Sequence, residues 1–104
     1  YGRTGVHISD FQTIDAILSI SKTSSLLQFK GFYLHPGHTY YGVDKQKIHE
    51  ESREALHLLK TTYQSSYPNL VTRLGDTPGC AVMEEFGDVD ELGPGNFVFF
   101  DLMQ

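Results

Sequence analysis

The sequence is poor in cysteine and in basic residues, and both scarcities exclude classes of protein. Cys80 is the one cysteine among 104 residues, so neither an internal disulfide nor a CxxC pair for zinc can form. Lys and Arg number 8 against 13 Asp and Glu, which gives a net charge of −5. Because phosphate contacts need clustered Lys and Arg, we expect no nucleic-acid partner. A lone thiol is typical of a reducing, cytoplasmic location.

Long apolar runs and a targeting segment are also lacking. No apolar stretch approaches the length of a membrane span and no signal peptide is visible, so we expect no membrane partner. The 104 residues suffice for one small domain, whereas a complete (β/α)8 barrel needs about 250. The sequence opens on a Gly-Arg-Thr-Gly turn and ends just after a strand-like run. We therefore expect an internal piece of a larger chain.

Short apolar runs alternate with segments of helical periodicity. A capping-box pattern at Ser9 and Gln12, with Asp10 in the first turn, predicts one helix start, and Asp44 is a suitable N-cap for the next helix. The predicted order is helix 10–21, strand 26–34, helix 45–64, strand 70–74, helix 79–86, strand 89–92 and strand 97–101. This alternation favours a parallel α/β architecture. The near-continuous apolar runs fit strands buried on both faces.

Three glycine-centred turns lie beside these apolar runs. In barrels with parallel strands, polar turns at the strand ends carry the chemistry. The densest turn, at residues 35–40, has two histidines and a tyrosine around Pro36 and Gly37. It is consistent with a ligand cradle, with a metal site that uses His35 and His38, or with a solvated surface turn. The metal interpretation is the weakest, because a catalytic zinc needs three protein ligands.

The other two turns have equally ordinary alternatives. Residues 75–80 can bind phosphate through Thr77 and backbone N–H groups, or Asp76 can simply cap a helix. Residues 93–96 are either the second wall of the same anion site or a plain type II turn. Cys80 is most simply a small apolar residue.

Taken in order, four segments resemble the D-serine dehydratase and D-threonine aldolase family, which are pyridoxal-phosphate enzymes with an alanine-racemase-type barrel. The matching segments are residues 2–5, 31–40, 75–78 and 94–101. The resemblance implies that residues 1–104 are part of a (β/α)8 barrel domain of parallel strands, incomplete in this chain. The first strands and the family's C-terminal β domain would lie outside it.

The resemblance implies contacts to the ring of pyridoxal 5'-phosphate. Arg3 matches an arginine near the ring oxygen, and His35 matches a histidine that lies against the pyridine ring. Tyr40 matches a tyrosine near the cofactor.

The resemblance also implies a phosphate cup. Thr77 matches its hydroxyl residue, and Gly95 and Asn96 match its other side. The turns would contribute dipoles to the phosphate, which suits a chain without a cluster of Lys and Arg.

No catalytic or metal residue is assigned to this chain. The family's Schiff-base lysine lies near the start of the full chain, and none of the lysines here has a matching context. In the dehydratases a divalent metal is held by the β domain, and His38 and Cys80 do not match those ligands. The implied function of the parent is a lyase or aldolase acting on D-β-hydroxy amino acids, such as D-serine or D-threonine, in a homodimer. An amino-acid racemase and a non-catalytic protein that binds pyridoxal phosphate are the alternatives.

Overall fold

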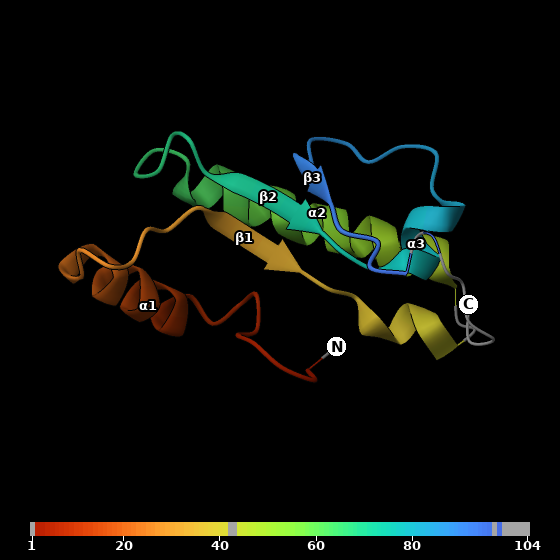
Figure 1. Ribbon diagram of the computed structural model, residues 1–104, viewed down its shortest axis with the longest axis horizontal. Coiled ribbons are helices and arrows are strands. Elements are labelled where there is room, and N and C mark those ends of the chain that lie inside the picture. The colour runs from red at the N-terminus through yellow and green to blue at the C-terminus, as the bar shows by residue number, and fades with distance from the viewer. Residues whose placement is uncertain (1, 42–43, 97, 99–104) are drawn as a thin grey trace.

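Three parallel strands form an open sheet with helices packed beside it. The computed structural model describes residues 2–41, 44–96 and 98. The strands are β1 (Gly31–Leu34), β2 (Val71–Leu74) and β3 (Glu91–Leu92), in the order β1-β2-β3. Leu34 pairs with Leu74 and Leu74 with Leu92 in a parallel register (Figure 1). The α/β class with parallel strands is confirmed, and the open sheet fits part of a barrel.

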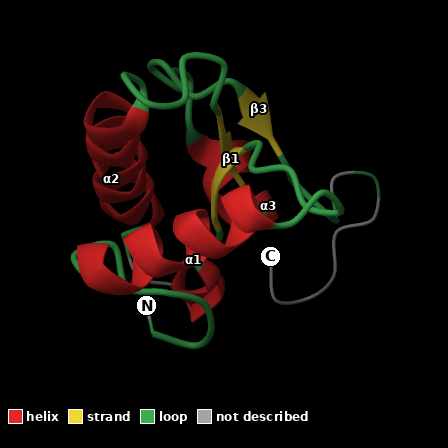
Figure 2. Cartoon of the chain, turned by 90° about the vertical axis from the view of Figure 1, so that its left-hand side faces the viewer, coloured by secondary structure: helices red, strands yellow, loops and turns green. Residues whose placement is uncertain are grey.

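The helices cover one face and one edge of this sheet. They are α1 (Phe11–Thr23), the 3-10 helix η1 (Gly37–Tyr41), α2 (Lys45–Tyr63) and α3 (Thr77–Val82). The long helix α2 runs along β1 and β2, and α1 lies beside the β1 edge (Figures 1 and 2). None of the described helices is long and apolar enough to cross a membrane.

The helix starts are set by aspartates. Asp44 accepts a 3.0 Å hydrogen bond from the Lys47 N–H, as its predicted role as an N-cap requires. In α1 the predicted capping box is wrong, because the Asp10 carboxylate takes the N-cap position and accepts from the Thr13 N–H at 3.0 Å. The hydroxyl of Ser9 instead contacts the ring of His7.

The core lies where α1 and α2 meet the start of the sheet. Its aromatic part includes Phe29 and Tyr67, whose ring centroids are 4.8 Å apart in an edge-to-face contact. The buried residues of this cluster are Ile14, Leu18, Leu59, Tyr63 and Leu70. Burial of these side chains supplies most of the energy that holds α1 and α2 to the sheet.

Several predicted boundaries are wrong for identifiable reasons. The first strand begins at Gly31 rather than at residue 26, and Leu26 is 92% exposed in a turn around Ser24. The third helix spans Thr77–Val82 rather than 79–86, because Asp76 caps it earlier. The strand β3 has two residues, η1 was not predicted, and the predicted strand 97–101 lies outside the described residues.

Candidate cofactor site

The ends of the three strands bring the glycine turns to one edge of the sheet. The Gly75 N–H donates to the carbonyl of Leu34 at 2.9 Å, and the Gly93 N–H donates to the carbonyl of Leu74 at 2.8 Å. The turn after β2 is therefore bonded to the end of β1, and the turn after β3 to the end of β2. The carboxyl ends of parallel strands are where α/β proteins bind ligands.

Asp76 joins two of these turns from a fully buried position. One carboxylate oxygen, Oδ2, accepts from the hydroxyl of Thr39 in η1 at 2.6 Å and from the Gly79 N–H in α3 at 2.5 Å. The residue is 0% exposed. The capping role predicted for Asp76 is confirmed, and the same carboxylate also positions η1.

Thr77 and Asn96 come together as neighbours. The Asn96 N–H donates to the hydroxyl oxygen of Thr77 at 2.9 Å, and Thr77 is 1% exposed. Since that oxygen is the acceptor in this contact, the Thr77 hydroxyl can still donate a hydrogen bond to a ligand. Gly95 adjoins open space, with nothing within 4 Å of the place a side chain would take. The alternative of a type II turn is wrong, because that turn needs a positive φ at Gly95 and Gly95 has none.

His35 lies beside two tyrosine rings. The centroids of the His35 and Tyr40 rings are 6.4 Å apart, with an angle of 34° between the planes. The hydroxyl of Tyr33 lies 3.4 Å from Nδ1 of His35. Tyr33 was missed from the sequence, although side chains two residues apart in an extended segment point to the same side.

Arg3 and His35 line one groove between the N-terminal segment, α1, β1 and α2. Its volume is about 840 Å³, and Pro36, His38 and Glu51 also line it. Burial lowers the pKa of His38, which favours its neutral form. Tyr40 and the three predicted phosphate residues do not line this groove. The described residues therefore form two groups, Arg3 with His35 and Thr77 with Gly95 and Asn96, and Tyr40 lies beside the first.

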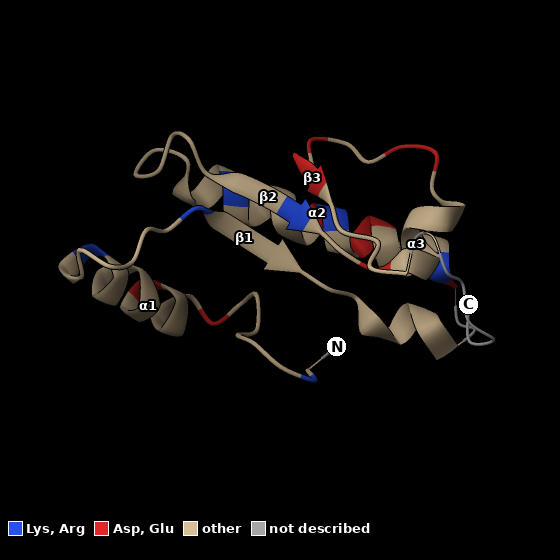
Figure 3. Cartoon of the chain, in the orientation of Figure 1, with Lys and Arg blue, Asp and Glu red and all other residues tan. Residues whose placement is uncertain are grey.

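The basic side chains are spread over the chain. Figure 3 shows Lys and Arg along the N-terminal segment, the end of α1, α2 and β2. Several pair with acidic residues, such as Lys60 with Asp90 at 3.1 Å.

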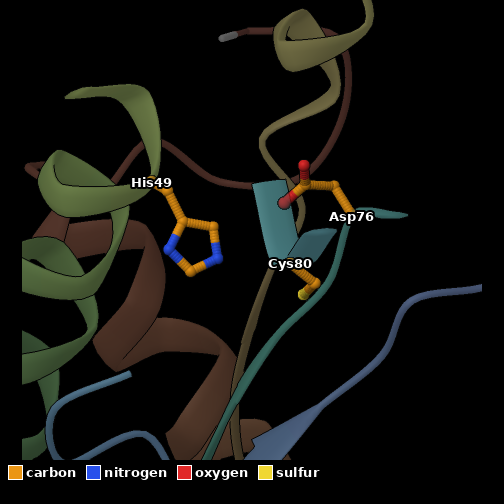
Figure 4. Close-up of side chains that lie close together, drawn as sticks. All are labelled: His49, Asp76 and Cys80. Atoms are coloured by element: carbon orange, nitrogen blue, oxygen red, sulfur yellow. The ribbon is translucent and has the colours of Figure 1, made fainter. Parts of the chain in front are cut away.

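One cluster of metal-ligand types was also missed from the sequence. The cluster lies just after the end of β2 and consists of His49, Asp76 and Cys80. One donor atom of each residue lies within 4.8 Å of the others (Figure 4). The helical period of α2 could have indicated that His49 is buried. His49 precedes the buried Leu56 by seven residues, and residues seven apart lie on the same face of a helix. The pair of His35 and His38, the weakest interpretation of that turn, has no third ligand grouped with it among the described residues.

Comparison with known proteins gives a match over the whole chain. The chain is similar to D-serine dehydratase of Dictyostelium discoideum. The two sequences are 30% identical over 115 aligned positions, which cover 100% of this chain and 29% of the dehydratase. No family model matches the chain. The similarity supports a D-serine dehydratase-like family, while the roles of the individual site residues, the homodimer and the cellular location stay predictions.

Proposed function

We propose that this chain supplies part of the cofactor site of a pyridoxal-phosphate-dependent lyase that acts on D-β-hydroxy amino acids of the D-serine type. The observation that carries the proposal is the similarity of the whole chain to a D-serine dehydratase. The chain spans less than a third of that relative, so the remaining catalytic groups are proposed to lie outside it. The contact between Thr77 and Asn96 and the position of His35 beside Tyr40 are compatible with the proposal.

The described residues fit such a cofactor in two respects. The space beside Gly95 and the donatable hydroxyl of Thr77 suit a phosphate group. A flat imidazole that contacts the hydroxyl of Tyr33 suits the face of an aromatic ring. When bound, pyridoxal phosphate supplies an electron sink for negative charge that develops at the substrate carbon.

Each side chain would then have a specific task. Thr77 would donate a hydrogen bond from its hydroxyl to the phosphate, while its oxygen accepts one from the Asn96 N–H. His35 would hold the ring in a fixed plane, with Tyr33 limiting rotation of the imidazole. Arg3, from the same groove as His35, would add a positive charge near the ring oxygen. These residues bind and orient, and we propose no proton transfer by them.

Removing the hydroxyl of Thr77 tests the phosphate contact. A hydrogen bond to a charged group contributes about 1.5–3 kcal/mol, so Thr77→Val should weaken cofactor binding roughly 10- to 100-fold by the usual conversion of free energy to affinity. The matched control is Thr61→Val, because Thr61 is exposed on α2 and bonds only to carbonyls of its own helix. Equal affinities in the wild type and in Thr77→Val, measured by fluorescence titration, would contradict the contact.

The reaction is tested by the products formed from each amino acid. A dehydratase converts D-serine into pyruvate and ammonia, with water lost and then regained, so the atoms balance. Pyruvate from D-serine with no glycine from D-threonine supports the proposal. Glycine and acetaldehyde from D-threonine would indicate an aldolase instead, and interconversion of serine enantiomers would indicate a racemase.

A further inference from the structure

We propose that His49, Asp76 and Cys80 form a binding site for a divalent metal ion of the zinc type. The three side chains come from α2, from the turn after β2 and from α3, and Figure 4 shows that they lie close together. Their donor atoms all lie within 4.8 Å of one another. The site does not depend on the proposed function, because none of its residues is assigned to the cofactor.

The strongest argument is the set of buried polar atoms that lack a partner. His49 is 0% exposed, and neither of its ring nitrogens has a hydrogen-bond partner among the described residues. Oδ1 of Asp76 is likewise buried without a partner. A buried polar group left unsatisfied costs about 1–3 kcal/mol. A cation between these atoms would satisfy one imidazole lone pair and the free carboxylate oxygen together.

Asp76 is already oriented as a metal ligand would be. Its Oδ2 is fixed by the hydroxyl of Thr39 and the Gly79 N–H, which leaves Oδ1 as the free atom. Metal-binding carboxylates are commonly held in this way by hydrogen bonds to their second oxygen. Thr39 thus acts as a positioning residue for the carboxylate.

Gly79 provides the space in which the carboxylate and the imidazole approach. A Cβ at position 79 would lie 2.5 and 2.7 Å from the two oxygens of Asp76 and 2.6 Å from Cδ2 of His49. Any larger residue would force these side chains apart. The His49 ring also packs edge-to-face on Phe86 with the centroids 5.6 Å apart, which limits rotation of the imidazole.

The donor set selects the kind of ion. Nitrogen, oxygen and sulfur together suit zinc, and three protein ligands leave a fourth position for water. Donors around a tetrahedral zinc lie roughly 3.3–3.7 Å apart, given bonds of about 2.0–2.3 Å, so the side chains need to close by about 1 Å. Binding would convert the Cys80 thiol to a thiolate and release its proton to solvent.

The experiment uses the full-length protein, stripped of metal with a chelator and titrated with Co²⁺ and then Zn²⁺. Cobalt bound to a thiolate gives an intense charge-transfer band, and the part of that band that Cys80→Ala removes reports Cys80. We expect the wild type to show this band and to bind one more equivalent of Zn²⁺ than Cys80→Ala. His49→Gln should also bind one equivalent of Zn²⁺ less than the wild type, and Asp76→Asn should bind this equivalent with lower affinity.

The matched control is His57→Gln, because His57 lies on the same helix in an exposed ion pair with Asp88. It should retain both the band and the metal content, and metal bound elsewhere in the protein would be equal in all variants. If His49→Gln fails to fold, Cys80→Ala decides, because Cys80 is only partly buried. Equal zinc content in the wild type and Cys80→Ala, or a thiolate band of equal intensity in these two proteins, would overturn the site.

Discussion

Replacing Asp76 by alanine should destabilise the protein more than removing any other helix cap, because this carboxylate is buried and holds two elements. Asp10 offers a matched comparison. Both aspartates accept a backbone N–H three residues along the chain and a threonine hydroxyl. They differ in surroundings, since Asp76 is 0% exposed and Asp10 lies at the surface.

The magnitude follows from the bonds that each carboxylate makes. Loss of an N-cap costs about 1 kcal/mol, and a hydrogen bond to a charged group contributes about 1.5–3 kcal/mol. Two effects reduce the cost of Asp76→Ala. Thr39 can turn its proton to the carbonyl of Pro36, which lies 3.0 Å away, and the unpartnered Oδ1 is removed as well. We expect a loss of about 2 kcal/mol for Asp76→Ala and a smaller loss for Asp10→Ala, because water replaces the exposed partner bonds of Asp10.

The assay is urea unfolding of the metal-free protein followed by far-UV circular dichroism. The midpoint should fall further in Asp76→Ala than in Asp10→Ala, with a similar slope in all proteins. Asp76→Asn should keep most of the cap, since asparagine is as good an N-cap as aspartate. Equal midpoints for the two alanine variants would refute the argument that burial makes the Asp76 contacts more valuable.

Three further perturbations have expected outcomes. Leu56→Ala should cost about 2–5 kcal/mol in urea unfolding because Leu56 is 1% exposed, whereas Leu58→Ala on the same helix, at 50% exposure, should change little. Burial raises the pKa of Tyr63 to about 12, so its neutral form is favoured and stability should fall between pH 10 and 12; an ultraviolet titration in which Tyr63→Phe removes no late-ionising phenol would contradict this. The Thr72 N–H lowers the pKa of Asp90, so this contribution to stability should be present above about pH 4 and lost as the pH falls through the lowered value; a pKa of Asp90 at its ordinary value by NMR would disprove it.

The helix α2 was predictable because local signals agree. Asp44 caps it, and the apolar stripe that ends at Tyr63 keeps a helical period over its length. The N-cap at Asp76 could also be predicted from the sequence, since Asp-Thr-Pro is a favoured helix start. These features depend on neighbours in sequence.

Features that depend on distant partners were harder to predict. The apolar run from Leu26 suggests a strand, but pairing with β2 begins only at Gly31. The sequence offered a shared site for Thr77 and residues 93–96 only as one of two alternatives, because 19 residues separate Asn96 from Thr77. The cluster of His49, Asp76 and Cys80 forms only because α2 packs near the end of β2, and no local sequence pattern predicts that packing.

The central claim is tested most directly by the absorbance spectrum of the full-length protein, recorded before and after borohydride and with D-serine added. The account predicts a visible band that borohydride abolishes and that D-serine shifts. A colourless protein that gains no such band after incubation with pyridoxal phosphate would contradict the account. The turns at the strand ends would then be explained by capping and packing alone.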